Sequence, residues 1–135
     1  MRTGILVLVL VAGMGTAAEA RHHRHGHGRH PASYDSGSVV AHPAGCPRSL
    51  FCGCGAAVRV FGTPRRDLWL AANWLRFPRA VPAAGMVAAR RGHVFVIEQV
   101  LENGNVIAWD ANSGRGQTRI HQVSLRGYQV VNPHG

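Results

Sequence analysis

The stretch that most constrains the fold is a cysteine–glycine turn that runs directly into an apolar segment, Leu-Phe-Cys-Gly-Cys-Gly-Ala-Ala-Val-Arg-Val-Phe, at residues 50–61. Its pattern predicts a short helix that begins at Cys54. A helix N-terminus carries unpaired amides and a partial positive charge, which favour the thiolate form of a cysteine placed there. The flanking glycines would let a substrate or other backbone approach the sulfur. Cys54 is therefore a candidate nucleophile.

The first twenty residues have the features of a secretory signal peptide. Arg2 gives a positive start, residues 5–11 are an uninterrupted apolar run, and Ala18-Glu19-Ala20 supplies small residues for a signal peptidase. We expect cleavage after Ala20. The apolar run is too short for a permanent anchor, and no later segment is long and apolar enough. We therefore expect an exported protein, periplasmic or extracellular, without an integral membrane anchor.

The chain has three cysteines, Cys46, Cys52 and Cys54. In an oxidising compartment an odd number leaves one thiol unpaired, either reactive or bonded to another chain. Cys46 and Cys52 are far enough apart to close a small loop, whereas a bond between Cys52 and Cys54 would be strained. This comparison favours a Cys46–Cys52 disulfide and a free Cys54.

The formal net charge of +9 comes from 15 basic and 6 acidic residues, and every basic residue is arginine. This balance favours an anionic partner such as a cell-wall polymer. Beyond residue 30 the arginines occur singly or in pairs, without the aromatic–basic interleaving of single-strand binders. We expect no nucleic-acid partner.

Residues 21–30 contain only histidine, arginine and glycine, so this segment cannot bury a core and is predicted to be disordered. We divide the chain into a signal peptide (1–20), a His/Arg-rich linker (21–45) and one folded domain (46–135). Neutral imidazole suits Zn²⁺, Ni²⁺ and Cu²⁺, so the linker is also a candidate metal-binding tract. Its weak candidate ligands are His22, His23, His25, His27 and His30.

Two helices are predicted at the start of the domain. The first covers residues 54–61 and ends at Gly62. The second covers residues 64–77, after Thr63 as a cap and before Pro78.

After these helices the sequence contains segments rich in β-branched and aromatic residues. They predict strands at 86–89, 93–100, 105–109, 118–123 and 128–132. Asn103-Gly104 predicts a two-residue hairpin turn. Two helices followed by antiparallel strands make an α+β domain.

Three polar residues would meet at one end of this hairpin. A Cys-His hydrolase needs a thiol, an imidazole that activates it and a polar group that orients the imidazole. His93 opens one strand, while Asp110 and Asn112 follow its partner. A turn centred between residues 103 and 104 would place Asp110 and Asn112 within a few residues of His93. The competing interpretations are a core cysteine, a surface histidine and ordinary turn residues.

Together, Cys54-Gly55 with Arg59, then Asn73-Trp74, Gly92-His93-Val94 and Asp110-Ala111-Asn112, resemble the CHAP branch of the NlpC/P60 papain-like superfamily, in particular its small exported α-proteobacterial members. The resemblance covers about residues 46–133. It implies a papain-like α+β fold in which two N-terminal helices pack on a small antiparallel sheet.

The same resemblance implies a cysteine amidase or endopeptidase that acts on peptidoglycan. In it Cys54 would be the nucleophile, His93 the general base and Asp110 the residue that orients the imidazole. Asn112 would be an additional polar group at the same site, and an alternative to Asp110 as the residue that orients the imidazole. We expect a monomer that needs no cofactor. Two alternatives remain open: an inactive module that binds the cell wall, and a periplasmic metal-binding protein that uses the His-rich tail.

Overall fold

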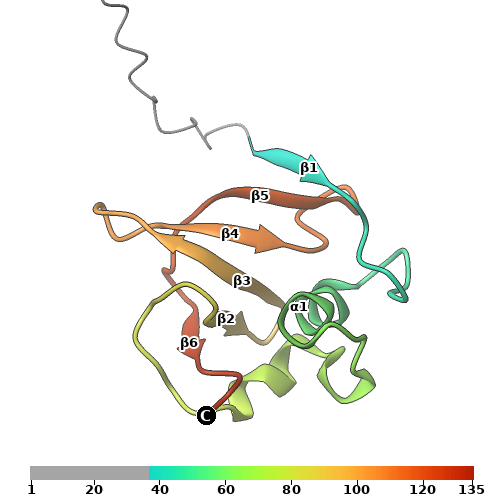
Figure 1. The fold of residues 1–135 in the computed structure, drawn as a ribbon, viewed down its shortest axis with the longest axis horizontal. Coiled ribbons are helices and arrows are strands. Elements are labelled where there is room, and N and C mark those ends of the chain that lie inside the picture. Colours follow the sequence, from blue (N-terminus) through green and yellow to red (C-terminus); the bar gives the residue numbers. More distant parts are fainter. Residues whose placement is uncertain (1–36) are drawn as a thin grey trace, which may run out of the picture.

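Six strands form one antiparallel sheet in the computed structural model, which describes residues 37–135 (Figure 1). The expected signal peptide and the five histidines of the tail lie outside the described residues. The order of strands across the sheet is β1-β5-β4-β3-β2-β6. In sequence they are β1 (Ser38–Val40), β2 (Val87–Arg90), β3 (His93–Val100), β4 (Val106–Asp110), β5 (Thr118–Val123) and β6 (Gln129–Val131).

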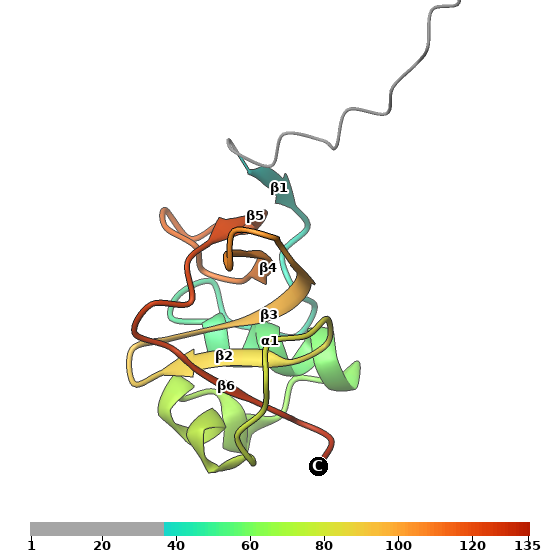
Figure 2. The same cartoon turned by 90° about the vertical axis from the view of Figure 1, so that its left-hand side faces the viewer.

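One α-helix, α1 (Cys52–Phe61), packs against the sheet beside β3 (Figures 1 and 2). It ends at Gly62, whose left-handed backbone (φ 72°) and amide bond to the carbonyl of Val58 form the predicted C-cap. Side chains alternate across β3. Val94 and Val96 therefore join the cluster under α1, while Phe95 and Ile97 join a second cluster with residues of β2, β4 and β6.

The predicted second helix is absent from the described residues. Its place is taken by two short 3₁₀ segments, η2 (Arg66–Leu68) and η3 (Ala71–Arg76), separated by an extended Leu70. The carbonyl of Leu68 accepts a hydrogen bond from the buried Trp74 indole at 2.9 Å. The prediction of one continuous helix was therefore wrong, because a side chain takes the carbonyl that an α-helix would pair with a later amide.

The predicted fold class is wrong as well. A papain-like α+β domain would have two N-terminal helices packed on a small sheet, but within residues 37–135 the sheet dominates and α1 is the one α-helix. The structure is a small sheet-rich fold.

The central hairpin forms at the predicted place but in a different register. Gly104 (φ 81°) donates to the carbonyl of Leu101, and Leu101 donates to Asn105, so the loop has three residues instead of two. A further irregularity lies between Ile97 and Gln99. As a result Val96 pairs with Trp109, whereas a turn centred between residues 103 and 104 would pair it with Ala111.

The first strand lies inside the segment that was predicted to be a linker. Ser38, Val39 and Val40 pair with Ile120, Arg119 and Thr118 of β5. The folded unit therefore begins before Cys46, and the predicted boundary at residue 45 falls too late.

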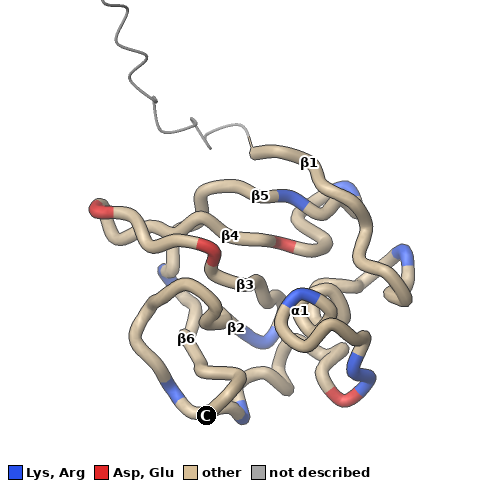
Figure 3. Tube along the Cα trace, in the orientation of Figure 1, with Lys and Arg blue, Asp and Glu red and all other residues tan. Residues whose placement is uncertain are grey.

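A bidentate ion pair joins α1 to β3. The Arg59 guanidinium donates to both carboxylate oxygens of Glu98, at 2.8 and 2.7 Å. The basic positions as a whole are spread over several elements and loops (Figure 3). No helix in residues 37–135 has the length and hydropathy of a membrane span.

Candidate active site

The free thiol of the protein belongs to Cys52, the first residue of α1. Cys46 and Cys54 form a disulfide with Cα atoms 5.7 Å apart. Both expectations about the cysteines were therefore wrong: Cys46 does not pair with Cys52, and Cys54 has no thiol to act as a nucleophile.

Helix geometry explains why Cys54 is in the disulfide and Cys52 is free. The helix begins two residues earlier than predicted, and positions two apart on a helix point roughly 200° away from each other. Cys54 thus faces Cys46 and Phe51, whereas Cys52 belongs to the cluster between α1 and the sheet.

The imidazole of His93 is held between Cys52 and Asp110. Nε2 of His93 lies 2.7 Å from Oδ1 of Asp110, and the side chain of Cys52 is near enough to the ring to raise its pKa. An ionised carboxylate only accepts hydrogen bonds, so Nε2 of His93 carries the proton in this contact. Nδ1 is then the ring nitrogen left for the thiol.

The environment of His93 favours its charged form. Burial lowers its pKa, but the side-chain contacts with Asp110 and Cys52, with the attraction of their charges, outweigh burial and raise the pKa to about 9. An imidazolium at neutral pH is the partner that a reactive thiolate needs.

A second histidine, His121, also contacts the carboxylate of Asp110. Nε2 of His121, on β5, lies 2.9 Å from Oδ2 of Asp110 and 3.0 Å from Oγ of Ser113. Asp110 is 4% exposed, so both of its oxygens need partners, and the two histidines supply them.

The sheet brings these side chains to one face. His121 pairs across the strands with Ala108, which lies two positions before Asp110 on β4. Directly paired residues share a face, and so do residues two apart on a strand. No role was predicted for His121 from the sequence, although the alternation of side chains along the predicted strand at 118–123 would place it on one face with its strand neighbours.

A cleft of about 160 Å³ opens beside the thiol. Its lining is Leu50, Cys52, Trp69, Leu70, Ala71, Arg91, Gly92 and Asn112. Leu50 and Leu70 are 84% and 70% exposed, so two large apolar side chains face solvent next to the buried sulfur. Leu50 also has a positive φ of 51°, which a bulky residue rarely adopts and which often marks functional sites.

Of the predicted site residues, the structure brings His93 and Asp110 into contact and places Asn112 in the wall of the cleft. Asn112 adopts a left-handed backbone (φ 59°) just after β4. It lies with Cys52 in the cleft, while Asp110 is the residue that contacts the imidazole.

The start of α1 lies very close to the segment that follows it. A side chain at Gly53 would collide with the carbonyl oxygens of Leu68 and Trp69, and one at Gly55 would collide with Ala111. These glycines therefore let the helix N-terminus, with its unpaired amides, sit at the cleft.

One polar group in the lining is unsatisfied. The indole nitrogen of Trp69 is buried and has no hydrogen-bond partner within residues 37–135. Leaving such a donor buried without a partner is costly, and the residue that carries it lines the cleft.

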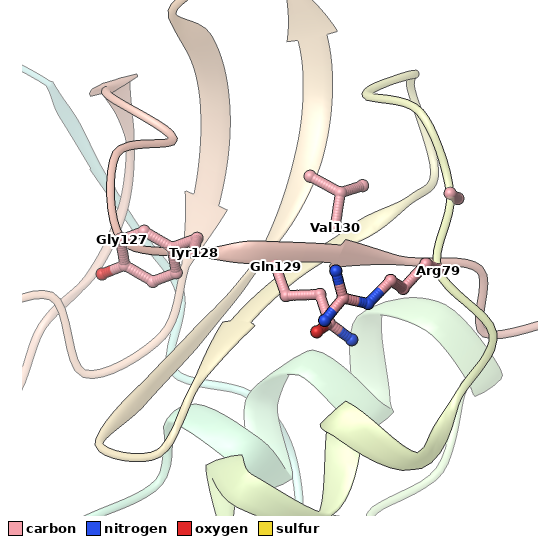
Figure 4. A pocket seen from close by; sticks show the side chains of 6 residues that line it. Arg79, Gly127, Tyr128, Gln129 and Val130 are labelled. Carbon is pink, nitrogen blue, oxygen red and sulfur yellow. The ribbon is translucent and has the colours of Figure 1, made fainter.

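A larger cavity of about 500 Å³ lies beside β6, lined by Arg79, Ala80 and residues 127–130 (Figure 4). Cys52 lines the smaller cleft and does not line this cavity, so the thiol chemistry belongs to the smaller cleft. In the described part of the chain, no three His, Cys, Asp or Glu side chains are placed to hold a metal ion.

A scan against models of known protein families and a search of curated proteins found no match to this chain.

Proposed function

We propose that the protein is an exported cysteine hydrolase that cleaves an amide bond in peptidoglycan peptides, with Cys52 as its nucleophile. The observation that carries the proposal is the arrangement of one free thiol at a helix N-terminus, a neighbouring imidazole whose pKa the thiol helps to raise, and a buried carboxylate 2.7 Å from Nε2 of that ring. These are the three parts of a Cys-His-Asp site.

The chemistry follows from the positions of the groups. The thiol proton already resides on Nδ1 of the His93 imidazolium at neutral pH, and the Cys52 thiolate attacks the amide carbon. The oxyanion is stabilised by the backbone amide of Cys52 at the start of α1, and such a donor lowers the barrier by about 3 kcal/mol. His93 then protonates the leaving amine, and the acyl group remains on the sulfur as a thioester. The neutral imidazole next takes a proton from a water molecule, which attacks the thioester and releases the acyl group as a carboxylic acid. Asp110 keeps the proton on Nε2 throughout.

The choice of peptidoglycan rests on the resemblance to CHAP proteins and on the signal-peptide pattern, with the arginine-rich composition favouring an anionic polymer. Using Cys52 lengthens two spacings of that resemblance by two positions, those to Arg59 and to Asn73-Trp74. Cys52 is also followed by glycine, but Arg59 then lies seven positions on and serves the contact with Glu98.

The test is to incubate the mature protein with purified peptidoglycan and measure new primary amines and soluble fragments. We expect Cys52→Ala and His93→Ala to abolish their release while circular dichroism shows an intact fold. The matched control is the double variant Cys46→Ala/Cys54→Ala, which removes the disulfide and keeps the thiol, and should retain activity. Release by Cys52→Ala at the wild-type rate, or no release by the wild type, would overturn the proposal.

A further inference from the structure

The carboxylate of Asp110 is shared by two imidazoles that approach from different strands. Oδ1 accepts from His93 on β3 at 2.7 Å, and Oδ2 accepts from His121 on β5 at 2.9 Å. With two donors on opposite oxygens, the plane of the carboxylate is fixed, and with it the orientation of the His93 ring.

Ser113 holds the second imidazole in turn. A histidine nitrogen that bonds to a carboxylate must carry a proton, so Nε2–H of His121 is shared between Oδ2 of Asp110 and Oγ of Ser113. The side chains of His121 and His93 are 23% and 18% exposed, which places the whole chain of contacts at the edge of the core. Cys52, His93, Asp110, His121 and Ser113 thus form one continuous series.

We propose that His121 is a positioning residue that acts on the thiol through Asp110 and His93. This inference rests on the proposed function in that it concerns the same site. A carboxylate held by His93 alone could rotate about its own bonds, whereas the contact with β5 prevents this. Without it, the imidazole would lose its alignment with the sulfur and the thiolate would lose its partner.

The test compares His121→Gln with His121→Met, two side chains of similar length of which only glutamine can donate to Oδ2. The readout is the rate at which iodoacetamide alkylates Cys52 between pH 5 and 10, since the disulfide protects the other two cysteines. We expect the Met variant to react between about 10- and 100-fold more slowly at pH 7. The Gln variant should stay within about threefold of wild type.

A second readout follows the imidazoles directly by NMR. The pKa of His93, about 9 in the wild type, should fall in the Met variant and recover in the Gln variant. Wild-type alkylation and an unchanged His93 titration in a folded Met variant would overturn the inference.

If the Met variant does not fold, the wild type decides by itself. Alkylating Cys52 should shift the ring resonances of His121 as well as those of His93, and unmoved His121 resonances would overturn the inference. The peptidoglycan assay gives a separate answer. Slow alkylation of the Met variant would support the positioning role even if the wild type released nothing from peptidoglycan.

Discussion

His93 and Asp110 meet through Nε2 and Oδ1 at 2.7 Å, although they lie 17 positions apart in the sequence. The contact is possible because the hairpin of β3 and β4 returns the chain to the level of His93. It assigns the ring proton to Nε2, so it decides which nitrogen faces the sulfur. The carboxylate thereby sets the direction of proton transfer in the site.

Asp110→Asn tests this assignment. An amide can accept from one histidine, but its NH₂ group then faces the Nε2–H of the other, so the arrangement of donors breaks. By comparison with the carboxylate of a catalytic triad, we expect turnover of peptidoglycan to fall on the order of 10³- to 10⁴-fold. Asp67→Asn is the control, because Asp67 is an exposed carboxylate paired with Arg65. Equal activity of the two variants would contradict the role of Asp110.

Stability should depend on pH through His93. Its folded pKa of about 9 is raised above the ordinary 6.5, so the imidazolium stabilises the fold fully below pH 6.5. This contribution is lost as the pH rises through 9 and amounts to no more than about 3 kcal/mol. Urea unfolding at pH 6, 7.5 and 9.5 measures it, and His93→Gln should flatten the decrease. An equal decrease in that variant would assign the effect to other groups.

The cysteine pairing can be read by mass spectrometry. Iodoacetamide added to the denatured but unreduced protein should label Cys52 alone, because Cys46 and Cys54 are bonded. The double variant Cys46→Ala/Cys54→Ala should lose about 2.5 kcal/mol of unfolding free energy, as the disulfide closes a loop with a separation of eight residues. A label on Cys54 would instead support the Cys46–Cys52 pairing.

The sequence predicted the sheet better than the helices. Five strands were visible because β-branched and aromatic residues fill segments such as 93–100. The edge strand Ser38–Val40 was missed because it has three residues and is held by its pairing with β5. The helix at 64–77 failed because Trp74 draws the Leu68 carbonyl out of helical pairing. That contact is tertiary and leaves no trace in periodicity.

The candidate site was likewise predicted only in part from the sequence. The contact of His93 with Asp110 was predictable because hairpin topology alone brings them close. The choice of cysteine was not predictable, because it depends on where the helix begins. Gly53 lies inside the helix and packs closely against the carbonyl oxygens of Leu68 and Trp69, and the local sequence does not indicate this tertiary contact. A local rule treats such a glycine as part of the preceding turn and moves the helix start to Cys54.

Gly53→Ala tests that crowding. Its Cβ would meet two backbone carbonyl oxygens, which cannot move without displacing η2, so we expect a loss of about 3 kcal/mol or more in unfolding free energy. Gly92→Ala is the matched control, since nothing lies within 4 Å of a Cβ there. It should change stability by less than about 0.5 kcal/mol. Equal chemical-denaturation curves for the two variants would show that the helix start is not so tightly packed.

Trp69→Phe separates stability from catalysis. The substitution keeps an aromatic ring in the wall of the cleft and removes the buried, unpartnered N–H, so the unfolding free energy should stay equal or rise by about 1 kcal/mol. If the indole donates to the substrate, kcat/KM should fall about tenfold, the effect of roughly 1.4 kcal/mol in the transition state. Trp74→Phe is the control, because its indole already donates to the Leu68 carbonyl. That variant leaves a cavity and an unpaired carbonyl in the core, so it should lose about 2 kcal/mol or more of stability and keep its kcat/KM. A Trp69→Phe enzyme with wild-type kcat/KM would exclude the indole N–H from substrate binding.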